Sequence, residues 1–480
     1  MKLLHRFAVQ RSEQGEFLRP GREREGPLGG AKRRGGAAEC KELLRVAEER
    51  PHEARDDEVA KRLGIYIHIP FCASKCAYCD FPSYAGCDRL MPKYHNALLK
   101  HIRESGELLQ RFYTDTVYFG GGTPTWYGAR RLSDLFNALK REGLVYREAE
   151  VTVEANPDSA RARDLTLLRA EGFNRISLGA QSANEDILKL IGRRHTWKQV
   201  ELAVKTARKA GFSNLSLDLI YGLPSQNKAD WADTLGRAID LGPEHISCYG
   251  LKLEEGTPLY SFKDSPMLPD DDEQADMYLY ACETLARYGY LQYEISNFAR
   301  PGFQSRHNMK YWLLRDYVGF GSGAASSIGG IRYSYVRGIG QYISGMQSEK
   351  TILAEYEKIG PVDRAAEYIM LGMRTVYGIS AREYHNRYRS DFAPLEETLE
   401  EFHTKGWALK ENERWHFTPS GFLLSNLLIG YLLDRQSERK LFDNPWMDGS
   451  ELLSDQTELP AGDEIFYHAP EQTQNEDIAT

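Results

Sequence analysis

The sequence lacks an apolar run long enough to cross a membrane. Its longest run, from Phe422 to Leu433, has about 12 residues, whereas a membrane-spanning helix needs about 20. The N-terminus has no apolar core followed by small residues, which is the pattern of a cleaved secretory signal. We therefore expect a cytoplasmic protein with no transmembrane segment.

An excess of positive charge is also missing. Lys and Arg number 61 against 69 Asp and Glu, for a net charge of -8 at pH 7, so the composition predicts no binding to nucleic acid. Hydrophobic residues make up 41% and charged residues 27% of the chain, which excludes a wholly disordered protein. A length of 480 residues accommodates a barrel of ordinary size and a smaller second domain.

The two ends of the chain lack a sustained apolar period. Residues 1–60 mix charges of both signs with Gly and Pro, and we predict a flexible, charged N-terminal extension. Its first 36 residues hold nine Lys or Arg against four Asp or Glu, which suits a solvated tail but also contact with an acidic partner or anionic lipid. Residues 441–480 carry ten acids from Asp443 onward and no Lys or Arg, which predicts a disordered acidic tail.

Between residues 61 and 300, short β-rich runs alternate with amphipathic helical stretches. This order is typical of βα units with a parallel sheet. Six such units predict an α/β fold with a partial (β/α)6 barrel rather than a closed eight-stranded barrel. We expect strands at 64–69, 116–119, 150–154, 175–178, 214–219 and 245–249.

The remainder of the chain divides into two further parts. Residues 301–360 are interpreted as a connecting segment, with a glycine-rich stretch at 319–330. Residues 361–440 contain helical stretches, then a short β pair at 408–410 and 415–418, then a final helix. This order favours a small C-terminal helical or winged-helix-like domain.

Three of the seven cysteines, Cys72, Cys76 and Cys79, form a CxxxCxxC motif directly after the first predicted strand. Three thiolates in one loop can hold three irons of a [4Fe-4S] cluster and leave the fourth iron open to another ligand. The amino and carboxylate groups of S-adenosylmethionine (SAM) can chelate that iron, and an electron from the reduced cluster can then release a 5'-deoxyadenosyl radical. The position of the loop agrees, because active sites gather at the carboxyl ends of parallel strands.

Zinc is the alternative metal for this loop. A structural zinc site has four closed ligands, so His68 or a distant cysteine would have to complete the set. The four scattered cysteines, Cys40, Cys87, Cys248 and Cys282, are interpreted as small packing residues or inert thiols.

Residues 63 to about 435 resemble the radical SAM family of oxygen-independent coproporphyrinogen III oxidase-like proteins (dehydrogenases), and within it the haem-chaperone branch. The dehydrogenase type continues the cluster motif with a fourth cysteine, where this chain has Phe81, as the chaperone type does. The segment from Arg306 to Trp312 matches the HNxxYW motif of the chaperones. The resemblance implies a radical SAM barrel that carries a [4Fe-4S] cluster and SAM.

The resemblance also implies a SAM site at the ends of the predicted strands. The glycine-rich turn at 120–125 is similar to the family's element that meets the SAM amino group, and it lacks the GxxxxGK[ST] pattern of a phosphate loop. Charged residues on apolar strands are costly to bury without partners, so a ligand near them is expected. The implied SAM-site residues are Tyr66, Tyr78, Gly121, Gly122, Thr123, Glu154, Gln181, Arg193 and Asp218.

The HNxxYW motif offers a candidate haem ligand. His307 is chemically suited to bind haem iron, and Tyr311 and Trp312 provide flat apolar faces for a porphyrin. On residue chemistry alone, a hydrogen-bonded structural histidine with core aromatics is the simpler interpretation. With the resemblance included, haem contact and a structural role are interpretations of equal weight. Met309 is the weaker haem-ligand candidate.

The resemblance implies a haem chaperone rather than an enzyme. Such a protein would pass haem to haem-dependent proteins, such as membrane respiratory enzymes, with peripheral contact at the membrane. The alternative is oxygen-independent coproporphyrinogen III dehydrogenase, an enzyme of porphyrin biosynthesis, against which Phe81 and the HNxxYW motif argue. Radical SAM methyl transfer is a third interpretation, for which no substrate is indicated. How many SAM molecules bind, whether SAM is cleaved, and whether the chain forms a homodimer stay open.

Overall fold

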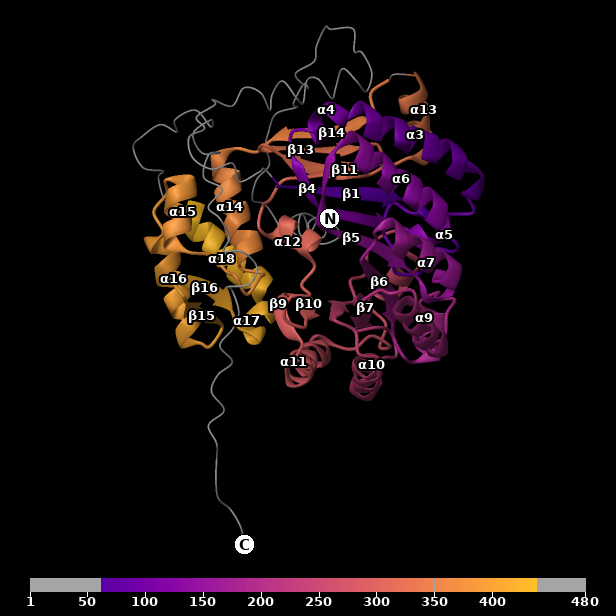
Figure 1. The fold of residues 1–480 in the computed structure, drawn as a ribbon. Coiled ribbons are helices and arrows are strands. Elements are labelled where there is room, and N and C mark those ends of the chain that lie inside the picture. The colour runs from indigo at the N-terminus through magenta and orange to yellow at the C-terminus, as the bar shows by residue number, and fades with distance from the viewer. Residues whose placement is uncertain (1–61, 349, 438–480) are drawn as a thin grey trace.

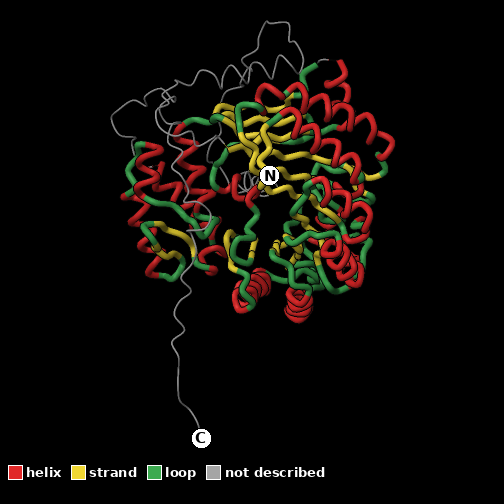
Figure 2. Tube along the Cα trace, in the orientation of Figure 1, coloured by secondary structure: helices red, strands yellow, loops and turns green. Residues whose placement is uncertain are grey.

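The computed structural model describes residues 62–348 and 350–437. The predicted N-terminal extension at 1–60 and the predicted acidic tail at 441–480 lie outside the described residues. Within the described chain, a twelve-stranded mixed sheet curves around a short central helix, and longer helices cover its outer face (Figures 1 and 2). None of the described helices combines the length and the apolar character needed to span a bilayer.

Seven strands of this sheet run parallel to their neighbours and form its centre. Six of them coincide with the predicted strands, so the expected α/β partial barrel is confirmed. In spatial order the seven strands are β11(Tyr317–Phe320), β1(Arg62–Ile69), β4(Tyr113–Gly121), β5(Leu144–Ala155), β6(Arg175–Gln181), β7(Asn214–Tyr221) and β8(His245–Gly250).

The helices between these strands are amphipathic and bury their apolar faces against the sheet. In α6, for example, Leu132, Leu135, Phe136 and Leu139 recur at the spacing of one helix face, and all four are buried. The covering helices are α3(Met91–Glu104), α6(Ala129–Glu142), α7(Ala162–Glu171), α9(Trp197–Lys209), α10(Lys228–Asp240) and α11(Asp271–Arg287), with shorter helices at α4(Gly106–Leu109), α5(Pro124–Tyr127) and α8(Glu185–Leu190).

Antiparallel strands extend the sheet at both edges. Beside β8 lie β10(Asn297–Ala299) and β9(Leu291–Glu294), and beside β11 lie β12(Ala325–Ile328), β13(Ile331–Tyr335) and β14(Leu353–Lys358). In the chain, helix α13(Ile339–Ser348) comes between β13 and β14. The segment at 301–360, interpreted as a connection, therefore contributes strands to the same sheet. Its glycines form turns: Gly329 and Gly330 have φ angles of 60° and 80°, which suits a two-residue hairpin turn between β12 and β13.

The C-terminal part has the predicted order of helices, a β hairpin and a final helix. It lies to one side of the barrel (orange to yellow in Figure 1). The boundaries drawn between the domains stay predictions. Its elements are α14(Pro361–Gly372), α15(Ala381–Tyr388), α16(Ala393–Thr404), β15(Ala408–Glu411), β16(Arg414–Phe417), α17(Pro419–Leu423) and α18(Ser425–Ser437).

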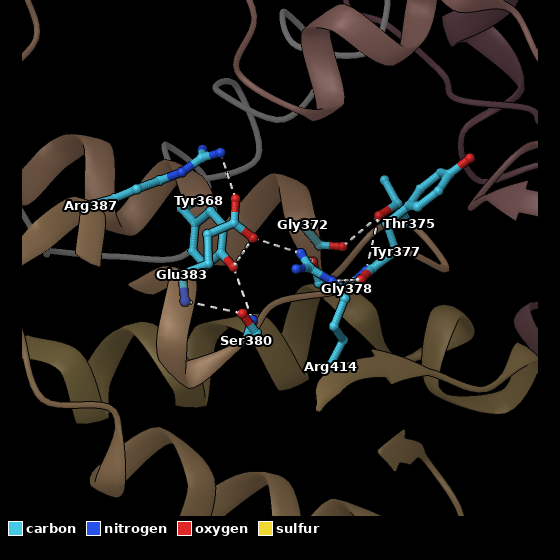
Figure 3. Close-up of polar contacts among 9 residues, drawn as sticks. All are labelled: Tyr368, Gly372, Thr375, Tyr377, Gly378, Ser380, Glu383, Arg387 and Arg414. Carbon is cyan, nitrogen blue, oxygen red and sulfur yellow. Dashed lines mark hydrogen bonds and ion pairs between the residues drawn. The ribbon is translucent and has the colours of Figure 1, made fainter. Parts of the chain in front are cut away.

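One carboxylate ties this C-terminal part together. Glu383 of α15 accepts a hydrogen bond from the Tyr368 hydroxyl at 2.9 Å and pairs with Arg387 at 2.6 Å and Arg414 at 2.8 Å (Figure 3). Burial by itself would raise the pKa of Glu383, but the charges of Arg387 and Arg414 outweigh it and lower that pKa. The ionised carboxylate thus joins α14, α15 and the hairpin.

Candidate cofactor site

The cysteine motif lies in a loop held at both ends. The loop leaves β2(Phe71–Cys72) and returns at β3(Tyr84–Ala85), which pairs with β2. Inside it, the Lys75 ammonium donates to the carbonyl oxygens of Phe81 at 2.7 Å and Ser83 at 3.0 Å. The backbone N–H of Ala77 donates to the carbonyl of Ile191, at the end of α8, at 3.0 Å. The three cysteines are therefore carried on a braced loop.

Each of the three sulfur atoms has a polar neighbour. Thr123 Oγ1 lies 3.7 Å from Cys72 Sγ, a guanidinium nitrogen of Arg193 lies 3.5 Å from Cys76 Sγ, and Ser83 Oγ lies 3.8 Å from Cys79 Sγ. Such contacts stabilise sulfur that carries negative charge.

Burial opposes ionisation of one of these thiols. It raises the pKa of Cys72, although the nearby hydroxyl groups of Thr123 and Ser83 counteract the effect. A positively charged ligand such as iron would offset the cost of the buried thiolate. In the described residues, no three His, Cys, Asp or Glu side chains are gathered closely enough to hold a single metal ion.

The loop forms one wall of an open cleft at the carboxyl ends of the parallel strands. The cleft is open to solvent and contains about 1100 Å³ of space when its mouth is included. Eleven of the predicted site residues line it: Cys72, Cys76, Cys79, Tyr78, Gly121, Gly122, Thr123, Glu154, Gln181, Arg193 and Asp218. Tyr66 and His307 do not line the cleft.

The glycine-rich turn packs its backbone directly against the cysteine loop. A Cβ atom on Gly122 would lie 3.0 Å from Cys72 Sγ and 2.7 Å from the carbonyl oxygen of Phe71. Gly121 has a φ of +117°, which side-chain-bearing residues rarely adopt. These glycines therefore allow the end of β4 to approach the cysteines closely.

Glu154, at the end of β5, is held from two sides. One carboxylate oxygen accepts a hydrogen bond from the Tyr118 hydroxyl at 2.9 Å, and the other accepts one from the backbone N–H of Gly121 at 3.1 Å. The carboxylate therefore has a defined orientation at the floor of the cleft. Gln181, at the end of β6, has a φ of 66°, a strained conformation for a residue other than glycine.

Arg193 and Asp218 contact further parts of the cleft wall. The Arg193 guanidinium donates to the Asn156 side chain at 2.8 Å and to the Gly179 carbonyl. Its Nε atom is buried without a hydrogen-bond partner among the described residues. Asp218 accepts hydrogen bonds from the hydroxyl groups of Ser177, Ser216 and Ser247 at distances from 2.9 to 3.3 Å.

Several residues that line the cleft were not predicted from the sequence. Asn156 follows β5 directly, and Tyr249 and Gly250 end β8. The rule that sites gather at the carboxyl ends of parallel strands would have found them. The residues that line the cleft without having been predicted include Ser74, Lys75, Asn156, Ser177, Tyr249, Gly250, Leu251 and Lys252.

His307 lies at the opposite end of the barrel from the mouth of the cleft. It belongs to α12(Arg306–Trp312), which contacts the first residues of β4, as the hydrogen bond between His307 Nδ1 and Thr116 Oγ1 at 2.8 Å shows. Its Nε2 lies 2.8 Å from the Tyr311 hydroxyl. The side chain is only 1% exposed, so both ring nitrogens are engaged inside the protein.

Two family models match the chain. Residues 66–238 match the Radical SAM superfamily and residues 360–424 match the HemN C-terminal domain. Together with the partial barrel and the CxxxCxxC loop, these matches define the class of the protein as radical SAM, and that class implies a [4Fe-4S] cluster and SAM.

Curated relatives named heme chaperone HemW match most of the chain. The relatives from Lactococcus lactis and Bacillus subtilis are 35% and 34% identical over 77% of this chain and 97% and 98% of their own length. The relative from Escherichia coli is 32% identical over 77% of this chain and 98% of its own. The chain belongs to the HemW family of radical SAM proteins.

A solved structure has the same fold. Coproporphyrinogen III oxidase (HemN) from Escherichia coli aligns with a TM-score of 0.71 over 82% of this chain and 93% of that chain, at 22% sequence identity. The similarity supports the partial barrel and the C-terminal helical part.

Proposed function

We propose that the protein is a haem chaperone that carries a SAM-binding [4Fe-4S] cluster and delivers haem to haem-dependent proteins. The curated relatives that span most of the chain are named for this activity. The observation that carries the proposal is Phe81, which lines the cleft where the dehydrogenase type has a fourth cysteine. Phenylalanine at that position matches the cluster motif of the chaperone type, which lacks the fourth cysteine of the dehydrogenase type.

The cluster and SAM are assigned to the cleft residues. Cys72, Cys76 and Cys79 fit as the three thiolate ligands, because they share one braced loop and each sulfur has a polar neighbour. When bound, the cluster supplies a Lewis-acidic iron and a source of one electron for SAM. Glu154 is oriented to accept hydrogen bonds from a cationic amino group.

Other cleft residues fit further parts of SAM. The unpartnered Nε of Arg193 provides a buried donor. Asp218, held by serine hydroxyls, provides an acceptor suited to ribose hydroxyl groups. Gly121, Gly122 and Thr123 leave room for the ligand to approach the backbone. Tyr66 does not line the cleft, but its hydroxyl contacts His68, which bonds to the return segment of the cysteine loop at Pro82.

Haem binding by His307 requires a rearrangement of α12. To ligate iron, a ring nitrogen would have to give up its hydrogen bond to Thr116 or Tyr311. Burial lowers the pKa of His307 well below the ordinary value and so keeps the ring neutral, the form that binds iron; the hydrogen bonds, not the charge of the ring, oppose ligation. Ligation of haem by His307 is therefore the part of the proposal that needs the most direct test.

The proposal includes a cellular setting. We place the protein in the cytoplasm, with peripheral contact at the membrane where acceptors such as respiratory enzymes reside, and with a homodimer as one form. Coproporphyrinogen III dehydrogenation is the alternative activity, against which Phe81 and the HNxxYW motif argue.

The decisive experiment is an anaerobic haemin titration of the reconstituted full-length protein, followed in the Soret band. Wild type should bind haemin saturably, at close to one haem per chain. The His307→Ala variant should show a changed spectrum if His307 is the ligand, while His101→Ala, which alters another buried histidine, should bind as wild type does. Absence of haemin binding by wild type, together with turnover of coproporphyrinogen III, would replace the chaperone by the dehydrogenase.

A further inference from the structure

The HNxxYW motif forms helix α12, whose two faces pack against different parts of the protein. His307 and Tyr311, four residues apart, point into the barrel, where His307 is bonded to Thr116 of β4. Met309 and Trp312 join an apolar cluster that includes Leu371 of α14. The first face therefore belongs to the interior of the SAM barrel, and the second to the contact with the C-terminal part.

The position of the His307 imidazole is fixed by more than its ring nitrogens. The backbone N–H groups of Arg306 and His307 each donate to the Glu150 carboxylate, at 3.0 Å in both cases. Ser305, the N-cap residue, accepts from the N–H of Asn308. The carboxylate and the cap hold the first turn of α12, so the ring has little freedom to move.

Two tyrosine rings stack on this imidazole from the side of the cleft. The ring centroid of Tyr118 lies 5.2 Å from that of His307, with an angle of 26° between the planes. The ring of Tyr66 lies at 6.5 Å and 27°. Both arrangements fall within the range of offset-stacked aromatic pairs. His307 therefore supports two rings that stand between it and the cleft.

Each of the two tyrosines holds a different part of the cofactor site. The Tyr118 hydroxyl donates to Glu154, which lines the cleft. The Tyr66 hydroxyl lies 3.1 Å from His68 Nδ1, and His68 Nε2 lies 2.9 Å from the carbonyl oxygen of Pro82. Because that carbonyl can only accept, His68 Nε2 is the donor and Nδ1 accepts from Tyr66. Pro82 lies in the return segment of the cysteine loop.

We propose that His307 is a positioning residue for the SAM site, whose ring fixes Tyr118 and Tyr66 and, through them, the Glu154 carboxylate and the cysteine loop. The inference rests on the proposed SAM site and goes beyond it, since His307 touches no cleft atom. It gives the buried histidine of the HNxxYW motif a role that does not require contact with haem.

The test measures SAM binding separately from haem binding. Reconstituted, full-length protein is titrated anaerobically with radiolabelled SAM by equilibrium dialysis, and the electron paramagnetic resonance spectrum of the reduced cluster is recorded with and without SAM. In His307→Ala, we expect the SAM dissociation constant to rise by about tenfold or more, as loss of two ring contacts implies. The SAM-induced change in the spectrum should shrink while iron and sulfide content stay at the wild-type level.

Two further substitutions separate stacking from hydrogen bonding. His307→Phe keeps a flat ring for Tyr118 and Tyr66 but cannot ligate iron, whereas His307→Gln can bond Thr116 and Tyr311 but cannot stack. We expect SAM binding to recover in the Phe variant and to stay weak in the Gln variant. The matched control is His101→Ala, because His101 is also buried and bonded to a tyrosine hydroxyl, that of Tyr342 at 2.8 Å, but lies on the outer helix α3.

Tyr118→Phe keeps the proposal testable if His307→Ala folds poorly, and together with His307→Ala it completes a double-mutant cycle. Tyr118→Phe removes only the hydroxyl that donates to Glu154 and should itself weaken SAM binding. If His307 acts through Tyr118, His307→Ala should have a smaller effect in the Tyr118→Phe background than in wild type. Additive effects would overturn the proposed route through Tyr118.

The outcomes separate this inference from the proposed function. If wild type binds no SAM, the SAM site fails and the inference fails with it. If wild type binds SAM and His307→Ala binds it equally well with an unchanged spectrum, the positioning role alone is refuted. Reduced SAM binding in His101→Ala to the same extent would also refute it, because a general loss of packing would then explain the result.

Discussion

The two ends of the barrel contain similar kinds of residues but use them differently. At the carboxyl ends of the strands, Glu154, Arg193 and Asp218 line an open cleft. At the amino ends, Glu150, His307 and Lys310 are buried and bonded within the protein. The type of side chain therefore does not distinguish a ligand site from a structural network. What distinguishes them is whether the polar atoms face a space that a ligand can fill.

The two ends also differ in their support. At the closed end, where Glu150, His307 and Lys310 lie, the strands belong to the large core that runs through the sheet, and α12 joins a further cluster with Leu371 of α14. The cysteine loop packs instead on a separate small cluster that includes Ile187, Leu188 and Ile220, with Ala77 and Tyr78 against it. We expect the cleft end to be the more easily loosened, because few apolar contacts hold it.

The largest effect should come from the cleft end. Replacement of one cluster ligand, Cys72→Ala, should abolish the [4Fe-4S] absorbance and the associated iron and sulfide after anaerobic reconstitution. The reason is that two thiolates cannot hold the cubane in place of three. Cys87→Ala is the matched control, since Cys87 is a free cysteine that does not line the cleft, and it should reconstitute fully. Full iron content in the Cys72 variant would show that the ligand assignment is wrong.

The closed end should respond in folding stability rather than in cofactor content. Lys310 and Asp115 form an ion pair of 2.7 Å whose side chains are 7% and 10% exposed. Burial lowers the pKa of Lys310, and the charge of Asp115 opposes that effect. Asp115→Ala leaves the ammonium unpaired and should lower the free energy of unfolding by about 3–5 kcal/mol, measured by denaturant titration of the apoprotein.

An exposed ion pair provides the control for that prediction. Lys228 and Asp276 lie 3.1 Å apart with side chains 59% and 63% exposed, so Asp276→Ala should cost at most about 1 kcal/mol. Equal losses in the two variants would mean that burial does not separate the closed end from the surface.

Much of the cleft was accessible from the sequence because motif and strand ends coincide there. The CxxxCxxC loop, the glycine turn and Glu154 each follow an apolar run that had to be a strand, and strand ends converge in a parallel sheet. The strands from β11 to β14 do not follow from the sequence pattern, because glycines such as Gly329 and Gly330 fit a connecting segment as well as the tight turn that they form.

The position of the HNxxYW motif in the fold cannot be predicted in this way. Whether His307 faces a ligand or the protein interior depends on how the sheet curves around α12. Sequence spacing predicts that His307 and Tyr311 share a helix face but not what that face touches. The same limit applies to Tyr66, which the family resemblance assigns to the SAM site but which does not line the cleft and contacts His68 instead.

A further buried carboxylate belongs to the edge strand β9. Glu294 of β9 is fully buried, and its partners are the Asn297 side chain and the N–H of Ser296. Burial raises the pKa of Glu294 to about 7, only partly offset by these hydrogen bonds. Because the folded-state pKa exceeds the ordinary value of 4.5, the favourable contribution to stability is complete below about pH 4.5 and is lost as the pH rises through about 7.

The Glu294→Gln variant should remove this pH dependence. The free energy of unfolding of the variant, relative to wild type, should increase by about 3 kcal/mol between pH 4.5 and pH 8. Denaturant titrations of both proteins across this range measure the difference. A constant difference at all pH values would mean that Glu294 titrates in the folded protein as it does in water.

The smallest effect tests the weaker support of the cleft end. Asn184 is the N-cap of α8, and its side chain accepts hydrogen bonds from the N–H groups of Asp186 at 3.0 Å and Ile187 at 3.3 Å. Asn184→Ala should destabilise α8 by about 1 kcal/mol. Because α8 ends where the cysteine loop bonds to Ile191, hydrogen exchange should become faster in both α8 and the loop at 72–79. Exchange at α12 should stay unchanged, since that helix packs on a different apolar cluster, which includes Leu371 of α14. Acceleration there would mean that the two ends of the barrel do not open independently.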